Sequence, residues 1–189
     1  MPRIVDYPDV LNRMESTGLR CLYHNSGAFG FPNDVRTFVR GWIGPDDQTI
    51  RTEAQSFVRR VAAPYEQALA TLAGRAWSEL LPGVVWVMPK SHWSYELQFG
   101  SQAWLPGLLE DLGIAPALLV ARNNAAAIEF GPEEVGPFTH FTAELLGNLL
   151  GSDFLLAWSG RPIVCSVHHH KQLWWVTSDP ELADRLDAI

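Results

Sequence analysis

The chain has 189 residues with 47% hydrophobic and 19% charged side chains, which is enough for one substantial core and excludes long disorder or a fibrous repeat. Its formal net charge is −7 at pH 7, and all of it arises after residue 80, where five basic side chains stand against twelve acidic ones. An acidic surface without a basic stripe repels phosphate backbones, so nucleic acid is not an expected partner.

The two cysteines, Cys21 and Cys165, form no C-x-x-C pair, so neither a disulfide framework nor a thiolate zinc site is expected. The N-terminal residues include acidic side chains and no apolar segment of signal-peptide length. No run approaches the roughly 20 apolar residues that span a bilayer. We therefore expect a cytoplasmic protein with no membrane partner. The eight tryptophans indicate thick aromatic packing, a ligand platform or a homo-oligomer interface.

The first part of the chain is predicted to be mostly helical. Helices are expected over residues 8–16, 52–63 and 65–81. The second is expected because Thr52 and Gln55 fit a capping box ahead of Phe57 and Val58. An irregular loop, rich in glycine and aromatic residues, is predicted over residues 19–35.

The stretch 90–99, KSHWSYELQF, alternates polar and apolar residues without a break. Successive side chains of a strand point to opposite faces, so this pattern predicts a half-buried strand that follows a strand at 84–88 in a hairpin. One face would pack into the core, and the other would present polar side chains that could bind a ligand. The apolar row is Trp93, Tyr95, Leu97 and Phe99, and the polar row is Lys90, His92, Ser94, Glu96 and Gln98.

The remaining elements alternate between helices and short strands. Helices are predicted over residues 102–112, 116–121, 137–150 and 180–188, and strands over 125–130, 154–158, 163–167 and 173–177, with a hairpin joining 154–158 to 163–167. We therefore predict one α+β domain over residues 1–189, with a helical part at 1–83 and a sheet-containing part at 84–189. Its sheet would be mostly antiparallel, with five or six strands and helices mainly on one face.

A second polar stretch, residues 165–175, contains His168, His169 and His170. Together with residues 90–99 it holds four of the six histidines and both lysines of the chain. In one interpretation the three histidines lie at an exposed bend between strands 163–167 and 172–177. If the stretch is instead one extended strand, His168 and His170 share a face and His169 points the opposite way.

Besides the exposed bend, two kinds of site are considered, a metal site on the extended strand and a basic patch indicated by the charge pattern. Histidines at i and i+2 on one strand face can share a metal ion such as Zn, Fe or Mn, and His92 and Glu96 would complete the ligand set with His168 and His170. Alternatively, a locally basic patch would attract a carboxylate or phosphate. The candidate ligand-binding residues are Lys90, His92, Ser94, Glu96, His168, His170 and Lys171.

Familiar catalytic signatures are missing from the sequence, including the Walker loop, the G-x-S-x-G elbow and H-E-x-x-H. This absence favours a binding or interaction module whose polar sheet face meets a small anionic ligand or a protein partner. The alternative is a metal-dependent, hydrolase-like enzyme that uses His92, Glu96, His168 and His170. Cys21, near Tyr23 and His24, is interpreted as a small buried residue rather than a nucleophile.

Overall fold

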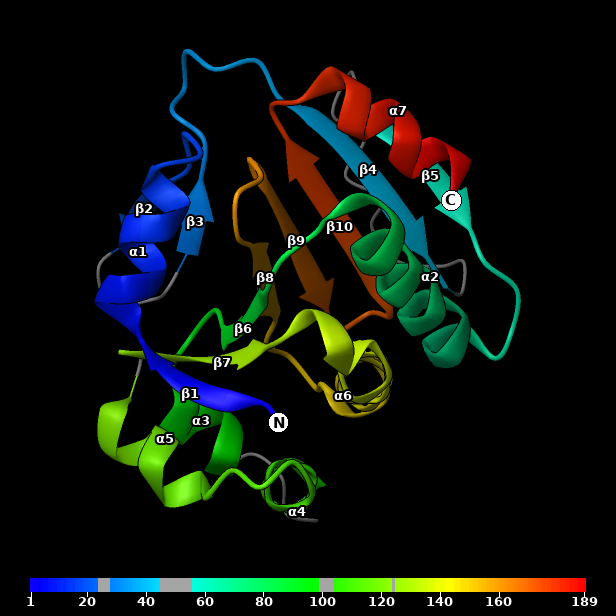
Figure 1. The fold of residues 1–189 in the computed structure, drawn as a ribbon. Coiled ribbons are helices and arrows are strands. Elements are labelled where there is room, and N and C mark those ends of the chain that lie inside the picture. Colours follow the sequence, from blue (N-terminus) through cyan, green and yellow to red (C-terminus); the bar gives the residue numbers. More distant parts are fainter. Residues whose placement is uncertain (24–27, 45–55, 99–103, 124) are drawn as a thin grey trace.

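Eight strands form the central sheet of the computed structural model, which describes residues 1–23, 28–44, 56–98, 104–123 and 125–189 (Figure 1). The strand order is β1-β7-β6-β8-β9-β10-β4-β5, and β4 and β5 form its one parallel pair. The strands are β1 (Arg3–Asp6), β4 (Phe38–Ile43), β5 (Ser56–Arg60), β6 (Val85–Pro89), β7 (Ala126–Phe130), β8 (Phe154–Trp158), β9 (Ile163–His168) and β10 (Gln172–Thr177). A separate small sheet pairs β2 (Arg20–Tyr23) with β3 (Ala28–Gly30).

Seven α-helices occur within the described ranges: α1 (Tyr7–Glu15), α2 (Tyr65–Leu80), α3 (Trp93–Gln98), α4 (Trp104–Asp111), α5 (Pro116–Arg122), α6 (Val135–Asn148) and α7 (Pro180–Ala188). A short 3-10 helix, Pro132–Glu134, precedes α6. No single one of these helices has the length and apolar character needed to cross a membrane. Only α4 and α5 taken together reach that length and apolarity, and they are bent by 110° at their junction.

The predicted α+β class is correct, but the predicted sheet of five or six strands is wrong. The sheet has eight strands and a parallel pair because the first sixty residues, which were expected to be mostly helical, also contribute β1, β4 and β5. The predicted helix at 8–16 is present as α1. The predicted loop at 19–35 also contains β2 and β3. Where a helix was expected to reach residue 63, β5 instead pairs with β4. Thr52 and Gln55, on which that helix was based, lie outside the described residues.

The stretch after β6 is a helix, so the predicted strand at 90–99 is wrong. Trp93 and Leu97 are four residues apart, a spacing that places both on one side of a helix as readily as on one face of a strand. Trp93 is fully buried and its indole N–H donates to the carbonyl oxygen of Ala126 over 2.8 Å. Tyr95 is 42% exposed, whereas Glu96 is only 6% exposed. Phe99 lies outside the described residues.

The predicted hairpin of β8 and β9 is confirmed, and β10 extends it as an antiparallel neighbour of β9. Leu156 pairs with Cys165, and Trp175 pairs with the same cysteine from the other side. The expected bend between these last two strands is also present, because Gln172 pairs directly with His168 and residues 169–171 make the turn. The chain is therefore not one extended strand from 165 to 175.

The two faces of the sheet are covered differently (Figure 1). One face, here called the closed face, packs against the apolar sides of α2, α4, α5, α6 and α7 through a large buried cluster. At its centre, the ring centroids of Trp42 and Trp158 lie 5.0 Å and 5.1 Å from that of Trp175. The opposite face, the open face, packs a smaller cluster against α1, around Val10, Met14 and Trp86.

Candidate functional site

A cavity of about 560 Å³ lies on the open face over β4, β8, β9 and β10. It has an apolar floor and one polar end. The floor is made by Val39, Leu155, Val164, Trp174 and Val176, the polar end by Lys90, Asp153, His168, His169 and His170, and Thr37, Ser166 and Gln172 complete the lining. A cavity that combines apolar walls with a few converging polar groups is the usual form of a small-molecule site.

The polar end of the cavity forms where three separate segments meet at the ends of the central strands β6, β8 and β9. Lys90 follows β6, Asp153 precedes β8, and β6 and β8 are antiparallel neighbours that pair Pro89 with Phe154. This register brings Lys90 beside Asp153, whose carbonyl oxygen accepts a hydrogen bond from the Lys90 amide over 2.9 Å. The side chains also form an ion pair, with Lys90 Nζ 3.1 Å from Asp153 Oδ2.

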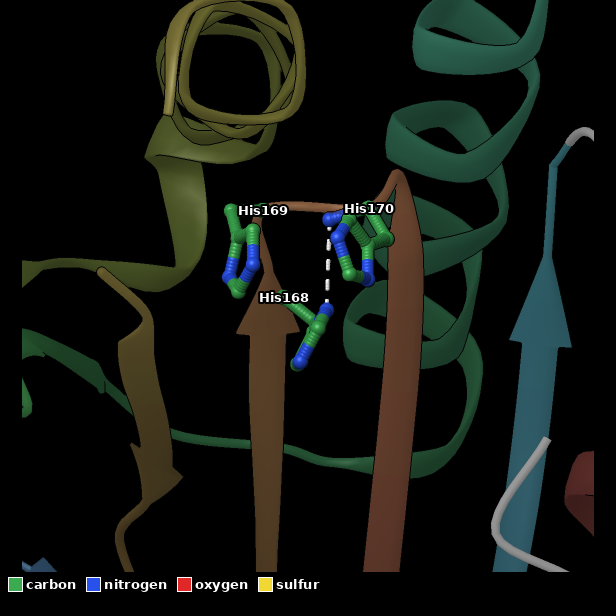
Figure 2. A group of neighbouring side chains, drawn as sticks. All are labelled: His168, His169 and His170. Atoms are coloured by element: carbon green, nitrogen blue, oxygen red, sulfur yellow. Dashed lines mark hydrogen bonds between the residues drawn. The ribbon is translucent and has the colours of Figure 1, made fainter. Parts of the chain in front are cut away.

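The turn between β9 and β10, residues 168–171, supplies the histidines and is called the histidine turn below. Lys171 adopts a positive φ of 57°, which closes a three-residue hairpin loop. The backbone N–H of His170 donates to Nδ1 of His168 over 3.2 Å (Figure 2). The His169 ring centroid lies 4.2 Å from each of the other two, so the three imidazoles gather at one place.

Asp153 anchors the histidine turn to the start of β8. Its Oδ1 accepts a hydrogen bond from the His169 backbone N–H over 3.2 Å and lies 3.0 Å from His169 Nδ1. Nε2 of His168 is 3.9 Å from the same oxygen. A neutral imidazole whose Nδ1–H faces a carboxylate has its lone pair on Nε2, and this orientation makes His169 Nε2 available to a ligand or metal.

Burial and neighbouring charges act on these groups in opposite directions. Burial raises the pKa of Asp153, but the charge of Lys90 and the contact with His169 outweigh it, so that pKa is lowered overall. For His168, burial lowers the pKa, and Asp153 opposes this only in part. At neutral pH the polar end therefore contains an ammonium–carboxylate pair and a neutral His168 imidazole.

Trp174 forms an aromatic wall of the cavity because Gly41 has no side chain. The two residues pair across β10 and β4, and a Cβ on Gly41 would lie only 2.6 Å from Trp174 Cζ3. The indole N–H donates to Gln172 Oε1 over 2.8 Å, which fixes the ring. Beside it, the Oγ of Ser166 is buried without a hydrogen-bond partner among the described residues.

The structure brings together only part of the set of residues proposed from the sequence. Lys90, His168 and His170 line the cavity. His92 is exposed at the start of α3, and the hydroxyl of Ser94 donates to Asn123 Oδ1. Lys171 forms an ion pair with Glu66 of α2.

Glu96, which was expected beside the histidines, has a separate environment. Its Oε1 accepts hydrogen bonds from the hydroxyls of Ser91 and Ser152. Burial raises the pKa of Glu96, the two serine hydrogen bonds oppose that rise, and the charge of Asp153 adds to it. Glu96 and Ser152 line a smaller cavity of about 180 Å³, to which Trp104 also contributes. In the described part of the chain, the histidine-containing group that could share an ion is His168, His169 and His170, without His92 or Glu96.

Most of the cavity lining was not identified from the sequence, and three of the missed residues, His169, Asp153 and Trp174, are central to the site. His169 was assigned to the face opposite His168, because strict alternation was extended through what is a turn. Asp153 could have been identified from the sequence, because it stands directly before the continuous apolar run of β8, at the end of a predicted strand. The sequence could not tell which of Trp174 and Trp175 lines the cavity, because this depends on which face of β10 is covered by helices.

Searches of protein-family models, curated proteins and solved structures found no match to this chain.

Proposed function

We propose that this protein is a binding module for a small molecule that has a flat apolar body and an anionic end group. The observation that carries the proposal is the 560 Å³ cavity, in which an aromatic wall and a cluster of histidines line one space. The apolar body would lie on Trp174 and the valine floor. The anionic group would lie at the polar end, beside Lys90 and the histidine turn.

The construction of the aromatic wall supports this proposal. Burying an indole fully would stabilise the fold more than leaving it partly exposed, yet Trp174 lines the cavity while the neighbouring Trp175 is 0% exposed. Gly41 leaves the space that the ring of Trp174 occupies. A partly exposed, hydrogen-bonded indole is a surface on which a flat ligand can stack.

The polar groups along the cavity support an oriented ligand rather than nonspecific apolar binding. Ser166 lines the cavity, and its buried Oγ has no hydrogen-bond partner among the described residues. The side chain of Lys90 is 39% exposed although its ammonium is paired with Asp153. Such groups give orientation and specificity, while the apolar floor contributes most of the binding free energy.

The probe for this proposal is 2-naphthoate, which has a flat apolar body and one carboxylate. Titration followed by ¹H–¹⁵N spectra should shift the Trp174 indole N–H resonance, assigned by its loss in Trp174→Phe. Trp174→Ala should weaken binding at least about tenfold, because stacking area is lost. Trp104→Ala, which removes another half-buried tryptophan outside this cavity, is the matched control. Equal binding to the two alanine variants would contradict the proposal.

A further inference from the structure

We infer that the histidine turn is a binding site for one divalent zinc-class ion, held by the imidazoles of His168, His169 and His170, with a fourth position open to the cavity. This inference deepens the proposed function, because the ion would receive the anionic group of the ligand. The three residues each offer one ring nitrogen, and these atoms lie within 4.8 Å of one another.

The distances are close to those of a metal centre. In a tetrahedral zinc site with Zn–N bonds of about 2.0–2.1 Å, ligand nitrogens are about 3.4 Å apart. The ligand nitrogens, which lie within 4.8 Å of one another, therefore need to approach by up to about 1.4 Å. Their side chains can make this movement, since those of His168 and His169 are 27% and 23% exposed and lie at a hairpin turn instead of in the core.

The surroundings of His169 match those of a metal-bound histidine. Its Nδ1 lies 3.0 Å from Asp153 Oδ1, which leaves Nε2 for the ion. Metal-binding histidines commonly donate the other ring N–H to a carboxylate, which fixes the tautomer and makes the ligand more basic. Asp153 would then be a positioning residue, held by Lys90 on its other oxygen.

His168 would have to give up one contact to bind the ion. Its Nδ1 accepts the N–H of His170 over 3.2 Å, and a neutral imidazole has a single nitrogen lone pair. Coordination through either nitrogen therefore releases or reorients the His170 N–H. The His170 amide resonance should thus change on metal binding, a change that a metal bound elsewhere on the surface would not produce.

An ion at this place would also supply the charge that the proposed ligand requires. Lys90 and Asp153 compensate each other, 3.1 Å apart, so the polar end has little net charge by itself. A divalent ion on three neutral imidazoles adds two positive charges and leaves a coordination position for a carboxylate oxygen. Three protein ligands and one open position are typical of zinc sites that bind a substrate or ligand.

The test uses the full chain, purified without a polyhistidine tag and freed of metal by chelation. Competition with a chromophoric chelator should show one equivalent of Zn²⁺ bound, with a shift of the His170 amide. Asp153→Asn should weaken Zn²⁺ binding about 10- to 100-fold, the range for lost outer partners of metal ligands, and His169→Ala should weaken it further. His140→Ala, which removes an exposed histidine on α6, and His92→Ala should leave it unchanged.

Equal Zn²⁺ affinity in His169→Ala and His140→Ala, or an unchanged His170 amide, would overturn the metal site. The 2-naphthoate titration separates this failure from that of the proposed function. Binding of naphthoate at Trp174 that is equal in zinc-free and zinc-loaded protein would leave the cavity proposal standing and overturn the role of the ion. Stoichiometric Zn²⁺ at the turn without naphthoate binding to either form would support the metal site and contradict the small-molecule proposal.

Discussion

The closed and open faces of the same sheet differ most clearly at two adjacent residues of β10. Trp175 is fully buried between Trp42 and Trp158, while Trp174 forms one wall of the cavity. Both are tryptophans in one strand, so residue type does not decide their roles. What differs is the covering: helices pack on the closed face, whereas the open face leaves a cavity over this part of the sheet.

The change from covered to open surface can be followed along β9. Its closed-face residues, Ile163, Cys165 and Val167, are all apolar and fully buried. Its open-face residues become more polar along the strand, from Val164 near α1 to Ser166 and then His168 at the polar end of the cavity. A strand whose residues alternate between apolar and polar only in its second half therefore marks the place where a covering element ends.

The largest expected effect is the loss of stability when the tryptophan on the closed face is removed. Trp175→Ala should lower the free energy of unfolding by about 3–5 kcal/mol, because it leaves a cavity within a closely packed cluster. Trp174→Ala should lower it by only about 1–2 kcal/mol, because that ring is partly exposed already. Urea unfolding followed by circular dichroism measures both.

Trp175→Phe provides a second test of this difference in stability. The Nε1 atom of Trp175 is buried without a hydrogen-bond partner among the described residues, so phenylalanine removes an unsatisfied donor along with some packing. Trp175→Phe should therefore lower the free energy of unfolding by much less than Trp175→Ala does. Similar losses in Trp174→Ala and Trp175→Ala would show that the two faces are equally important for stability.

A smaller effect is expected when a methyl group is added beneath the aromatic wall. Gly41→Ala should lower the free energy of unfolding by about 1–3 kcal/mol, because the new Cβ would lie 2.6 Å from Trp174 Cζ3 and the indole must move. It should also weaken naphthoate binding, since the displaced ring enters the cavity.

Gly107→Ala is the control for this substitution. Gly107 lies within α4 with nothing within 4 Å of the added Cβ, so alanine there should stabilise the protein by about 0.5–1 kcal/mol. A stable Gly41→Ala variant with an unshifted Trp174 indole resonance would contradict the view that Gly41 positions the ring.

The sequence predicted elements well where the length of an apolar run and its flanking turn residues leave a single assignment. The apolar runs of β8 and β9 and the turn at Gly160 and Arg161 were sufficient for the hairpin. At residues 93–97 the pattern was ambiguous, because Trp93 and Leu97 fit both a strand and a helix. The candidate site was predicted in part for a related reason: Lys90 and the histidines could be named, but Asp153 joins them only through the sheet register.

The smallest expected effect concerns Glu96 and pH. Its pKa is raised by burial and by Asp153, against the serine hydrogen bonds, so the folded state binds this proton more tightly than the unfolded state does. The contribution of Glu96 to stability is therefore fully present below the ordinary carboxyl pKa of about 4.3 and is lost as pH rises through the higher folded-state pKa. Glu96→Gln does not titrate, so its stability relative to the parent should rise across this window, by less than about 1.4 kcal/mol per pH unit. Urea midpoints between about pH 4 and 7, with Glu110→Gln on the exposed side of α4 as the control for net charge, measure this difference. A relative stability that falls with pH would mean that the two serine hydrogen bonds outweigh burial, and that Glu96 is held as a carboxylate.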